Sequence, residues 1–194
     1  MWFKQLTLFR IESGQIPTAA ELNQKLLGGI FTPCLGLDWF SEGFTAPFPD
    51  QPENLVFNTP DCMAVVLKRE DKVLPKSVIM EAVRKRITAI RNSEDRKVGR
   101  REQAEIQEAV IDNMLPRAFC KISQTDALIH TTDNLLLINT ASASKAGDFL
   151  GRLREVMGGF YVTAICILRW DFYKSHLILL TQQILNLQSK VETI

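Results

Sequence analysis

The sequence predicts an α+β protein, in which a mainly antiparallel sheet is packed by helices and carries an inserted helical-hairpin arm. Short apolar and β-branched runs separated by turn residues occur before and after the middle of the chain, as expected for strands. Apolar residues at helical spacing fill the middle, from about residue 75 to 114. The 194 residues, 46% apolar and 23% charged, are enough to bury a core in one domain or two small ones.

The chain begins with a predicted strand and a short helix. Residues 2–11 carry apolar side chains on both faces, which indicates a strand covered on both sides. Thr18 and Glu21 then match a capping box, in which each side chain accepts a hydrogen bond from the other's backbone. Gly28-Gly29 supplies the stop for this helix.

A proline-rich loop and a second strand follow. Residues 45–60 hold four of the eight prolines, which predicts a loop with a short strand at 55–57. Residues 62–67 are predicted to form a strand by their β-branched content. The charged residues 69–72 are expected to close it as a turn.

Two helices are predicted in the middle of the chain. The first begins near Pro75, a residue tolerated in the first turn of a helix. Asn92, Ser93 and Gly99 interrupt its pattern, and a second helix follows from about residue 101 to 114. We expect the two to pair as a hairpin with basic residues at its bend. The apolar stripe of the first helix consists of Ile79, Val83, Ile87 and Ile90.

Strands are predicted again after the hairpin. Pro116 ends the second helix, because the residue before a proline is disfavoured in helical conformation. Strands are then expected at about 120–123, 127–130 and 135–138. Residues 131–134 suit the turn between the last two, since they include Asp and Asn.

A last helix and a tail complete the prediction. Ser142 or Ser144 is expected to cap the helix, and Gly158-Gly159 to end it. In the tail, the apolar residues of 177–187 are spaced as in an amphipathic helix. No apolar run reaches the roughly 18 residues that span a bilayer, so no membrane association is expected.

Charge is balanced overall but not locally. The chain has a net charge of +1, which excludes a uniformly basic histone-like protein. Residues 1–67 carry a net charge of −4, residues 68–121 carry +5, and residues 122–194 carry none. A local basic segment attracts a polyanion even when the whole molecule is near neutral. A solvated helix face with interspersed acids would give the same pattern.

The cysteines do not indicate a metal centre. They are widely spaced, no CxxC pair exists, and neither histidine lies near them in sequence, whereas a zinc site draws on close pairs. We expect four buried or half-buried free thiols in a reducing cytoplasm, with a distant disulfide or a reactive thiol as alternatives. The four are Cys34, Cys62, Cys120 and Cys166.

No motif indicates catalysis, a cofactor or a metal. The chain contains no phosphate-binding glycine loop and no GxSxG motif. A metal-dependent nuclease needs several carboxylates gathered on a rigid core, whereas the acids here are expected mostly at strand ends and turns. His130 is predicted to be a strand-face histidine rather than a general base. The acids considered are Asp61, Glu70, Asp71, Asp126 and Asp133.

Phe119 has two interpretations. It follows Arg117 where a strand or turn begins, and its pattern alone favours a core aromatic. The alternative is a contact residue that fills a pocket on a partner, as aromatic residues do at interface centres.

Eight segments of the chain form a combination of motifs that is specific although each alone is weak. They are Trp2–Leu6, Phe31–Cys34, Val73–Pro75, Arg96-Lys97, Leu115–Phe119, Ser123–Thr125, Thr140–Ala146 and Leu153-Arg154. In this order, over about residues 1–159, the chain resembles the RdgC family of bacterial recombination-associated proteins.

The resemblance implies a DNA-binding recombination modulator that is not an enzyme. Members form ring-shaped homodimers around double-stranded DNA, bind it without sequence preference and restrain RecA-driven strand exchange. The position of Phe119 is then expected to enter a pocket on the partner at the helical tips, and Arg96 and Lys97 match basic tip residues. Such a protein is expected in the cytoplasm, associated with the nucleoid.

From the charge pattern and the resemblance together, we predict a phosphate-binding surface. Its basic groups are expected to face the DNA, and its affinity to depend strongly on salt. The predicted residues are Lys68, Lys76, Arg84, Lys85, Arg91, Arg96, Lys97, Arg100, Arg101, Arg117 and Lys121.

The resemblance also suggests how the chain is divided. Residues 1–74 and 119–159 are expected to form a central α+β domain and residues 75–118 the helical tip. Residues 161–194 are expected to be a divergent tail, as a frameshift or an early stop leaves, in a chain that lacks the family's C-terminal part. Two other functions stay open: an oligomerisation or interaction domain without DNA function, and a metal-dependent exonuclease, a label that the family has also carried.

Overall fold

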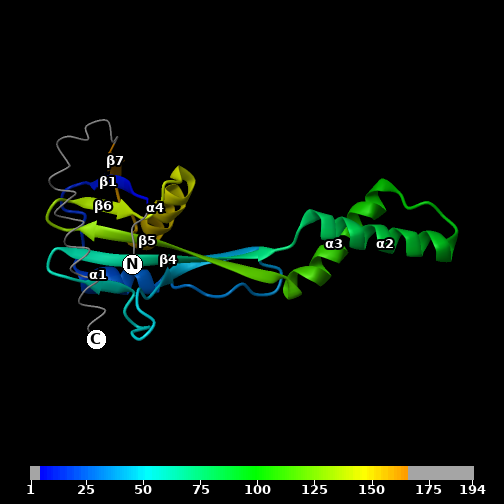
Figure 1. The fold of residues 1–194 in the computed structure, drawn as a ribbon, viewed down its shortest axis with the longest axis horizontal. Coiled ribbons are helices and arrows are strands. Elements are labelled where there is room, and N and C mark those ends of the chain that lie inside the picture. The colour runs from blue at the N-terminus through cyan, green and yellow to red at the C-terminus, as the bar shows by residue number, and fades with distance from the viewer. Residues whose placement is uncertain (1–4, 166–194) are drawn as a thin grey trace. The chain divides into compact units, whose positions relative to one another are not determined.

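The fold is known from a computed structural model, which describes residues 5–165. It has the predicted α+β architecture, with four α-helices and a seven-stranded antiparallel sheet (Figure 1). The strands are β1 (Thr7–Ile11), β2 (Phe40–Thr45), β3 (Val56–Asn58), β4 (Cys62–Val73), β5 (Phe119–His130), β6 (Leu135–Ile138) and β7 (Val162–Ala164). The helices are α1 (Ala19–Leu27), α2 (Lys76–Glu94), α3 (Arg100–Met114) and α4 (Ala143–Met157), with a short 3₁₀-helix η1 at Leu115–Arg117.

The chain divides into two compact units. The described part of unit 1 consists of residues 5–28, 46–66 and 125–165, and unit 2 consists of residues 29–45 and 67–124. Unit 2 therefore contains the predicted helical hairpin together with segments before and after it. The strand order is β2-β4-β5-β6-β1-β7, and β3 pairs with β4.

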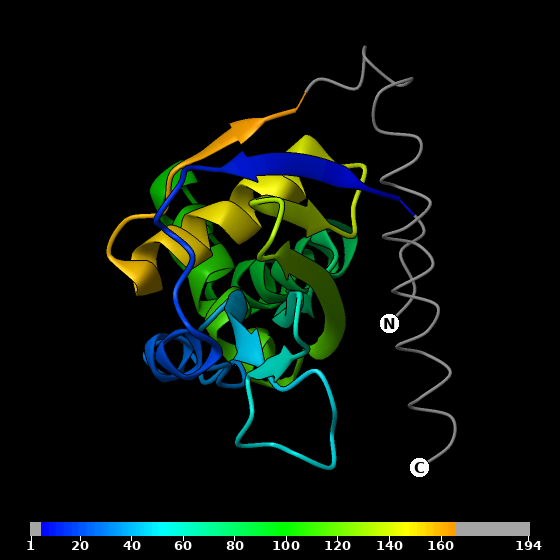
Figure 2. The same cartoon turned by 90° about the vertical axis from the view of Figure 1, so that its left-hand side faces the viewer.

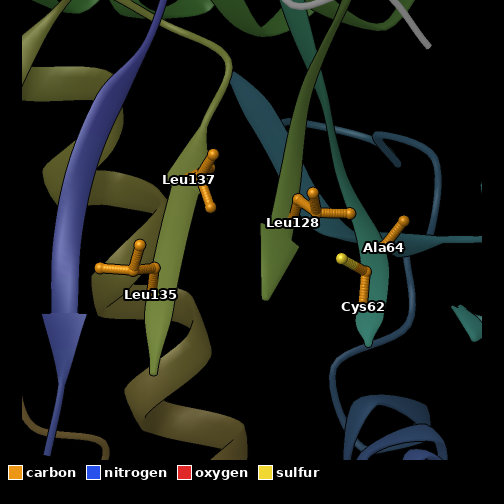
Figure 3. Packing of buried hydrophobic residues seen from close by; sticks show 5 residues of the cluster. All are labelled: Cys62, Ala64, Leu128, Leu135 and Leu137. Atoms are coloured by element: carbon orange, nitrogen blue, oxygen red, sulfur yellow. The ribbon is translucent and has the colours of Figure 1, made fainter. Parts of the chain in front are cut away.

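Unit 1 buries both faces of its central strands. β1 pairs antiparallel with β6, which pairs antiparallel with β5, so Phe9 lies opposite Leu136 and Leu136 opposite Ile129. These residues share one face of the sheet, and all three are buried. The other face carries an apolar cluster of Cys62, Ala64, Leu128, Leu135 and Leu137 (Figure 3). The strand predicted at residues 2–11 is observed as β1 over Thr7–Ile11, and the predicted cover on both of its faces is confirmed here.

Two capped helices complete unit 1. The side chain of Thr18 accepts a hydrogen bond from Glu21 N–H, and Glu21 accepts one from Thr18 N–H, so the predicted capping box of α1 is present. Ser142, one of the two predicted candidates, caps α4 by accepting from Lys145 N–H. Gly158 ends α4 in the left-handed conformation, with φ of 73°, as predicted for the glycine pair.

Unit 2 has a close backbone contact between β2 and the preceding segment. Phe31 N–H donates to Phe44 O, and Phe44 N–H donates to Gly29 O, both at 2.8 Å. Gly43 lies so near this segment that a Cβ atom would come 2.5 Å from Phe31 Cα. This approach requires glycine at position 43.

The predicted elements differ from the observed ones at several points. The turn predicted at 69–72 is wrong, because β4 continues to Val73; Arg69 and Asp71 lie on one face of the strand and pair with each other at 3.0 Å. The strands predicted at 120–123 and 127–130 are parts of the single strand β5. β2 and β7 were not predicted.

β7 lies within the segment that was predicted to be a divergent tail. It pairs antiparallel with β1, with Phe9 opposite Ala164 and Ile11 opposite Val162 (Figure 2). The amphipathic helix predicted for residues 177–187 lies outside the described residues. Among residues 5–165, no helix combines the length and the apolar character that crossing a bilayer requires.

Candidate nucleic-acid interface

The α2–α3 hairpin carries most of the predicted phosphate-binding residues. The two helices lie side by side in unit 2 (Figure 1). α2 buries Ile79 and Val83, and Ile87 and Ile90 are half-buried along the same stripe. No residue of α3 is fully buried. A narrow apolar seam therefore joins the helices, and most of their remaining surface faces solvent.

The two helices of the hairpin differ in charge. α2 carries five basic and two acidic residues, whereas α3 carries two basic and four acidic residues. Glu105, Glu108 and Asp112 of α3 are exposed and lie within one sector of its surface. The basic character thus belongs to α2 and to the residues that connect it to α3.

Several basic side chains of the hairpin are exposed and have no carboxylate partner among the described residues. Arg84 and Arg91 stand seven positions apart on α2 and therefore share a face. Such groups can bind phosphate without first breaking an ion pair. They are Lys76, Arg84, Arg86, Arg91, Lys97 and Arg100; Arg86 was not among the predicted residues.

Three predicted residues of the hairpin are paired with acids. Lys85 lies 3.4 Å from Glu81, and Arg101 lies 3.1 Å from Glu105. Both are exposed helical i,i+4 pairs, which contribute little and exchange readily for other anions. Arg96 is held by two carboxylates at once, those of Glu94 and Glu102.

The remaining predicted residues lie on the strands and on η1. Lys68 of β4 is half-buried, with Nζ 4.4 Å from the ring centroid of Phe31, a cation–π geometry. Arg117 of η1 and Lys121 of β5 are exposed. Lys72 was not predicted to bind DNA, and its Nζ donates to Gly36 O at 3.3 Å and Leu115 O at 3.0 Å.

Phe119 is exposed. It is the first residue of β5, and 88% of its surface is accessible, so the core interpretation favoured by its pattern is wrong. Leu35 is 72% exposed and Ile122 56% exposed in the same unit. A set of exposed apolar residues before β4 was not predicted. It consists of Leu35, Leu37, Trp39 and Phe40. Gly36, which has a positive φ, is the sequence signal for a turn among them.

The acids considered for a nuclease site have local partners. Glu70 accepts a hydrogen bond from Cys34 N–H at 2.8 Å, and Asp71 pairs with Arg69. Asp126 accepts from Asn139. Glu70, Asp71 and Asp126 lie inside strands, so their predicted placement at strand ends and turns is wrong.

His130 and Asp61 lie at strand ends in unit 1. His130 is buried at the end of β5, and its Nδ1 accepts a hydrogen bond from Asp133 N–H at 3.2 Å. This confirms the strand-face interpretation. Asp61 accepts from Thr132 Oγ1 at 3.4 Å. Over residues 5–165, no three or more His, Cys, Asp or Glu side chains are grouped so as to hold a metal ion.

The cysteines differ in burial. Cys62 is buried and Cys34 half-buried, as predicted, but Cys120 is exposed, and all three are free thiols. Burial raises the pKa of Cys62 to about 11, with the nearby Asp61 carboxylate adding to the effect. Cys166 lies outside the described residues.

The structure is that of an α+β protein whose helical hairpin exposes basic side chains on α2, with the exposed Phe119 in the same unit. Comparison with known sequences gives its family. A family model described as "Putative exonuclease, RdgC" matches residues 1–168, past residue 159, where the resemblance was expected to end.

Curated relatives agree with this match. Recombination-associated protein RdgC of Neisseria meningitidis serogroup C (strain 053442) is 45% identical over 159 residues, which are 82% of this chain and 53% of the relative. The proteins of the same name from Laribacter hongkongensis (strain HLHK9) and Proteus mirabilis (strain HI4320) are 39% and 30% identical, over 82% and 85% of this chain and 53% and 55% of the relatives. The chain belongs to the RdgC family. It spans about half the length of the curated relatives it matches.

Proposed function

We propose that this protein binds double-stranded DNA without sequence preference, as a homodimer, and thereby modulates recombination. The observation that carries the proposal is the exposed basic surface of α2, the following turn and the start of α3, where six side chains have no carboxylate partner among the described residues. Contacts from such groups to phosphates carry no base information, so binding is expected to be independent of sequence. Membership of a family of recombination-associated proteins agrees with this role.

Salt dependence tests the DNA-binding part. Fluorescence anisotropy with two duplexes of unrelated sequence is expected to give equal affinities that fall steeply between about 50 and 200 mM salt, because each phosphate contact releases counterions. Absence of binding at low salt, or an affinity that salt does not change, contradicts the proposal.

A matched pair of variants locates the surface. Arg84→Gln combined with Arg91→Gln removes two unpaired charges from one face of α2. The slope of log K against log salt should become less steep by about 0.9 for each phosphate that these side chains no longer neutralise. Lys25→Gln combined with Lys145→Gln removes two exposed charges from unit 1 and should leave the slope unchanged. Equal effects of the two pairs would show that α2 is not the DNA surface.

Phe119 supports the homodimer. An exposed phenylalanine in a unit with other exposed apolar side chains suits the centre of a protein–protein contact. Sedimentation velocity should show a dimer of the wild type, and the Phe119→Ala variant should need a higher protein concentration to dimerise. Tyr161→Ala, which truncates a 62% exposed side chain in unit 1, is the control and should not affect the equilibrium. A wild-type monomer at micromolar concentration contradicts the dimer.

The proposed modulation of recombination would result from the protein covering the DNA duplex. A protein bound along double-stranded DNA, and hence located at the nucleoid, obstructs RecA-driven strand exchange without touching RecA. Strand exchange should slow on addition of the protein, and the variant with Arg84→Gln and Arg91→Gln should slow it less. Equal inhibition by that variant would indicate a direct action on RecA.

Two other functions remain as outcomes of these tests. A dimer that does not bind DNA at low salt would favour an oligomerisation or interaction domain. The family's description as an exonuclease is tested by incubating end-labelled duplex with the protein and Mg²⁺. A loss of label that needs the metal would favour the nuclease over the binding protein.

A further inference from the structure

An arginine and a glutamine bond to the turn between α2 and α3: Arg96 pairs with acids on both sides of it, and Gln103 Nε2 donates to Val98 O at 3.2 Å. Asp95 ends α2 in the left-handed conformation, with φ of 47° and ψ of 38°, which turns the chain out of the helix. Four residues later, Gly99 is the N-cap of α3 and has no side chain with which to cap it. The backbone of this turn therefore needs stabilisation from side chains elsewhere.

Arg96 supplies it by joining the two helices. Its Nε lies 2.5 Å from Glu94 at the end of α2, and its Nη1 and Nη2 lie 2.7 and 2.6 Å from the two carboxylate oxygens of Glu102 in the first turn of α3. The second contact is the bidentate fork that arginine forms with a carboxylate. Glu102 stands at N3 of α3, three residues after the N-cap Gly99.

This arrangement affects what Arg96 can bind. Its hydrogen bonds to Glu102 and then to Glu94 raise the pKa of Arg96, and the hydrogen bond from Arg96 lowers the pKa of Glu102. Three of the five N–H donors of the guanidinium are directed at carboxylates. A phosphate would have to displace both acids. The next residue, Lys97, is exposed and has no such partner among the described residues.

We propose that Arg96 is a positioning residue, which fixes the turn between α2 and α3 so that Lys97 and Arg100 are presented to phosphate. The inference rests on the proposed DNA binding and deepens it. It assigns different roles to three neighbouring basic residues: Arg96 shapes the surface, whereas Lys97 and Arg100 bind phosphate. Glu94 and Glu102 then contribute to DNA binding by holding Arg96 in place, although their own negative charge repels phosphate.

Removal of the Glu102 side chain should change the affinity for duplex DNA in opposite directions, depending on whether Arg96 binds phosphate or positions the turn. If Arg96 binds phosphate, Glu102→Ala frees it, so affinity for duplex DNA rises and the salt slope steepens. If Arg96 positions the turn, the same change loosens it. The control is Glu108→Ala, which removes the same charge from α3 without touching Arg96. We expect Glu102→Ala to bind several-fold more weakly than Glu108→Ala; equal or tighter binding overturns the proposal.

A second comparison separates charge from geometry. Arg96→Lys keeps the charge but loses the bidentate fork, and Lys97→Gln removes a phosphate contact. Arg96→Lys should weaken binding and keep the wild-type salt slope, whereas Lys97→Gln should reduce the slope by about 0.9 for each copy bound. An Arg96→Lys protein with wild-type affinity would contradict the proposal.

Hydrogen exchange in the DNA-free protein shows the turn directly. The amide of Gln103, bonded to Gly99 O at 2.9 Å, should exchange faster in Arg96→Lys than in Lys97→Gln. Unchanged exchange in Arg96→Lys overturns the positioning role. If the wild type binds no DNA, the proposed function has failed, and the exchange data still decide whether Arg96 orders the turn.

Discussion

Unit 1 and unit 2 of the protein differ in what they bury. Of the 28 apolar residues buried in the described chain, 23 lie in unit 1, and unit 2 contributes Phe44, Leu67, Ile79, Val83 and Leu115. The large apolar side chains that remain exposed have the opposite distribution. Leu27 and Tyr161 belong to unit 1, and the other nine belong to unit 2.

The difference separates a region that buries its apolar side chains from one that leaves many of them exposed. Burial of apolar area is the main favourable term in folding, so unit 1 is expected to carry most of the stability. Unit 2 instead exposes basic and apolar side chains to solvent. Exposed apolar side chains are tolerated in a soluble protein as long as the patch they form is small. Its surface composition suits the binding of DNA and of a second chain.

The largest expected effect is the loss of a core aromatic residue from unit 1. Phe149 of α4 is fully buried, and Phe149→Ala should lower the free energy of unfolding by about 3–5 kcal/mol, because apolar burial is reduced and a cavity remains. Phe119→Ala in unit 2 removes the same atoms from an exposed site and should change it by less than about 0.5 kcal/mol. Urea unfolding of both, at a concentration that keeps the chain monomeric, measures the contrast. Similar losses of unfolding free energy in the two variants would contradict the proposed difference in stability between the units.

A smaller effect is expected where unit 2 is closely packed. In Gly43→Ala the new Cβ would meet the backbone of residues 30 and 31, with the nearest atom, Phe31 Cα, at 2.5 Å. Since the backbone itself must shift, we expect a cost of about 1–3 kcal/mol in unfolding free energy, which urea unfolding measures.

Gly147 of α4 provides the matched control. Its Cβ would meet nothing within 4 Å, so Gly147→Ala should raise helix stability by about 0.5–1 kcal/mol. If Gly43→Ala is neutral as well, the close approach at β2 is not a constraint on unit 2.

In both units the sequence predicted the elements that have local signals, and it missed β2 of unit 2 and β7 of unit 1. α1 and α4 were recognisable because their signals are local: a capping box at Thr18, a serine cap and a glycine stop. β6 was recognisable because every residue from Leu135 to Ile138 is apolar and buried. β2 has a polar sequence, and its strand conformation depends on pairing with β4 and on the approach of residue 31 to Gly43, neither of which is a local pattern.

The candidate interface was predicted in part. Charge counting located the basic segment, but it could not tell a free guanidinium from one held by acids. Arg96 and Lys97 are neighbours in sequence and equally basic, yet two carboxylates, one of them six residues away, bind only Arg96. The exposure of Phe119 was equally hidden, because an aromatic residue at the start of a strand has the same pattern inside or outside a core.

The smallest expected effect concerns the helix caps, which also differ between the units. α1 and α4 of unit 1 have side-chain caps, whereas α2 and α3 of unit 2 begin at Pro75 and Gly99 without one. Thr18→Ala should therefore cost about 1 kcal/mol in urea unfolding, because the N–H of Glu21 is left without its acceptor.

The complementary change adds a cap to unit 2. Gly99 has φ of −72° and ψ of 166°, and a Cβ there would meet nothing within 4 Å, so serine fits without strain. Because Glu102 stands at N3, Gly99→Ser gives the capping-box spacing of serine and glutamate and should stabilise α3 by about 0.5 kcal/mol. Amide exchange in the first turn of α3 should slow accordingly. Because this change stiffens the turn without altering any charge, it should leave the salt slope of DNA binding as it is; a changed slope would mean that the uncapped turn itself contributes to phosphate binding.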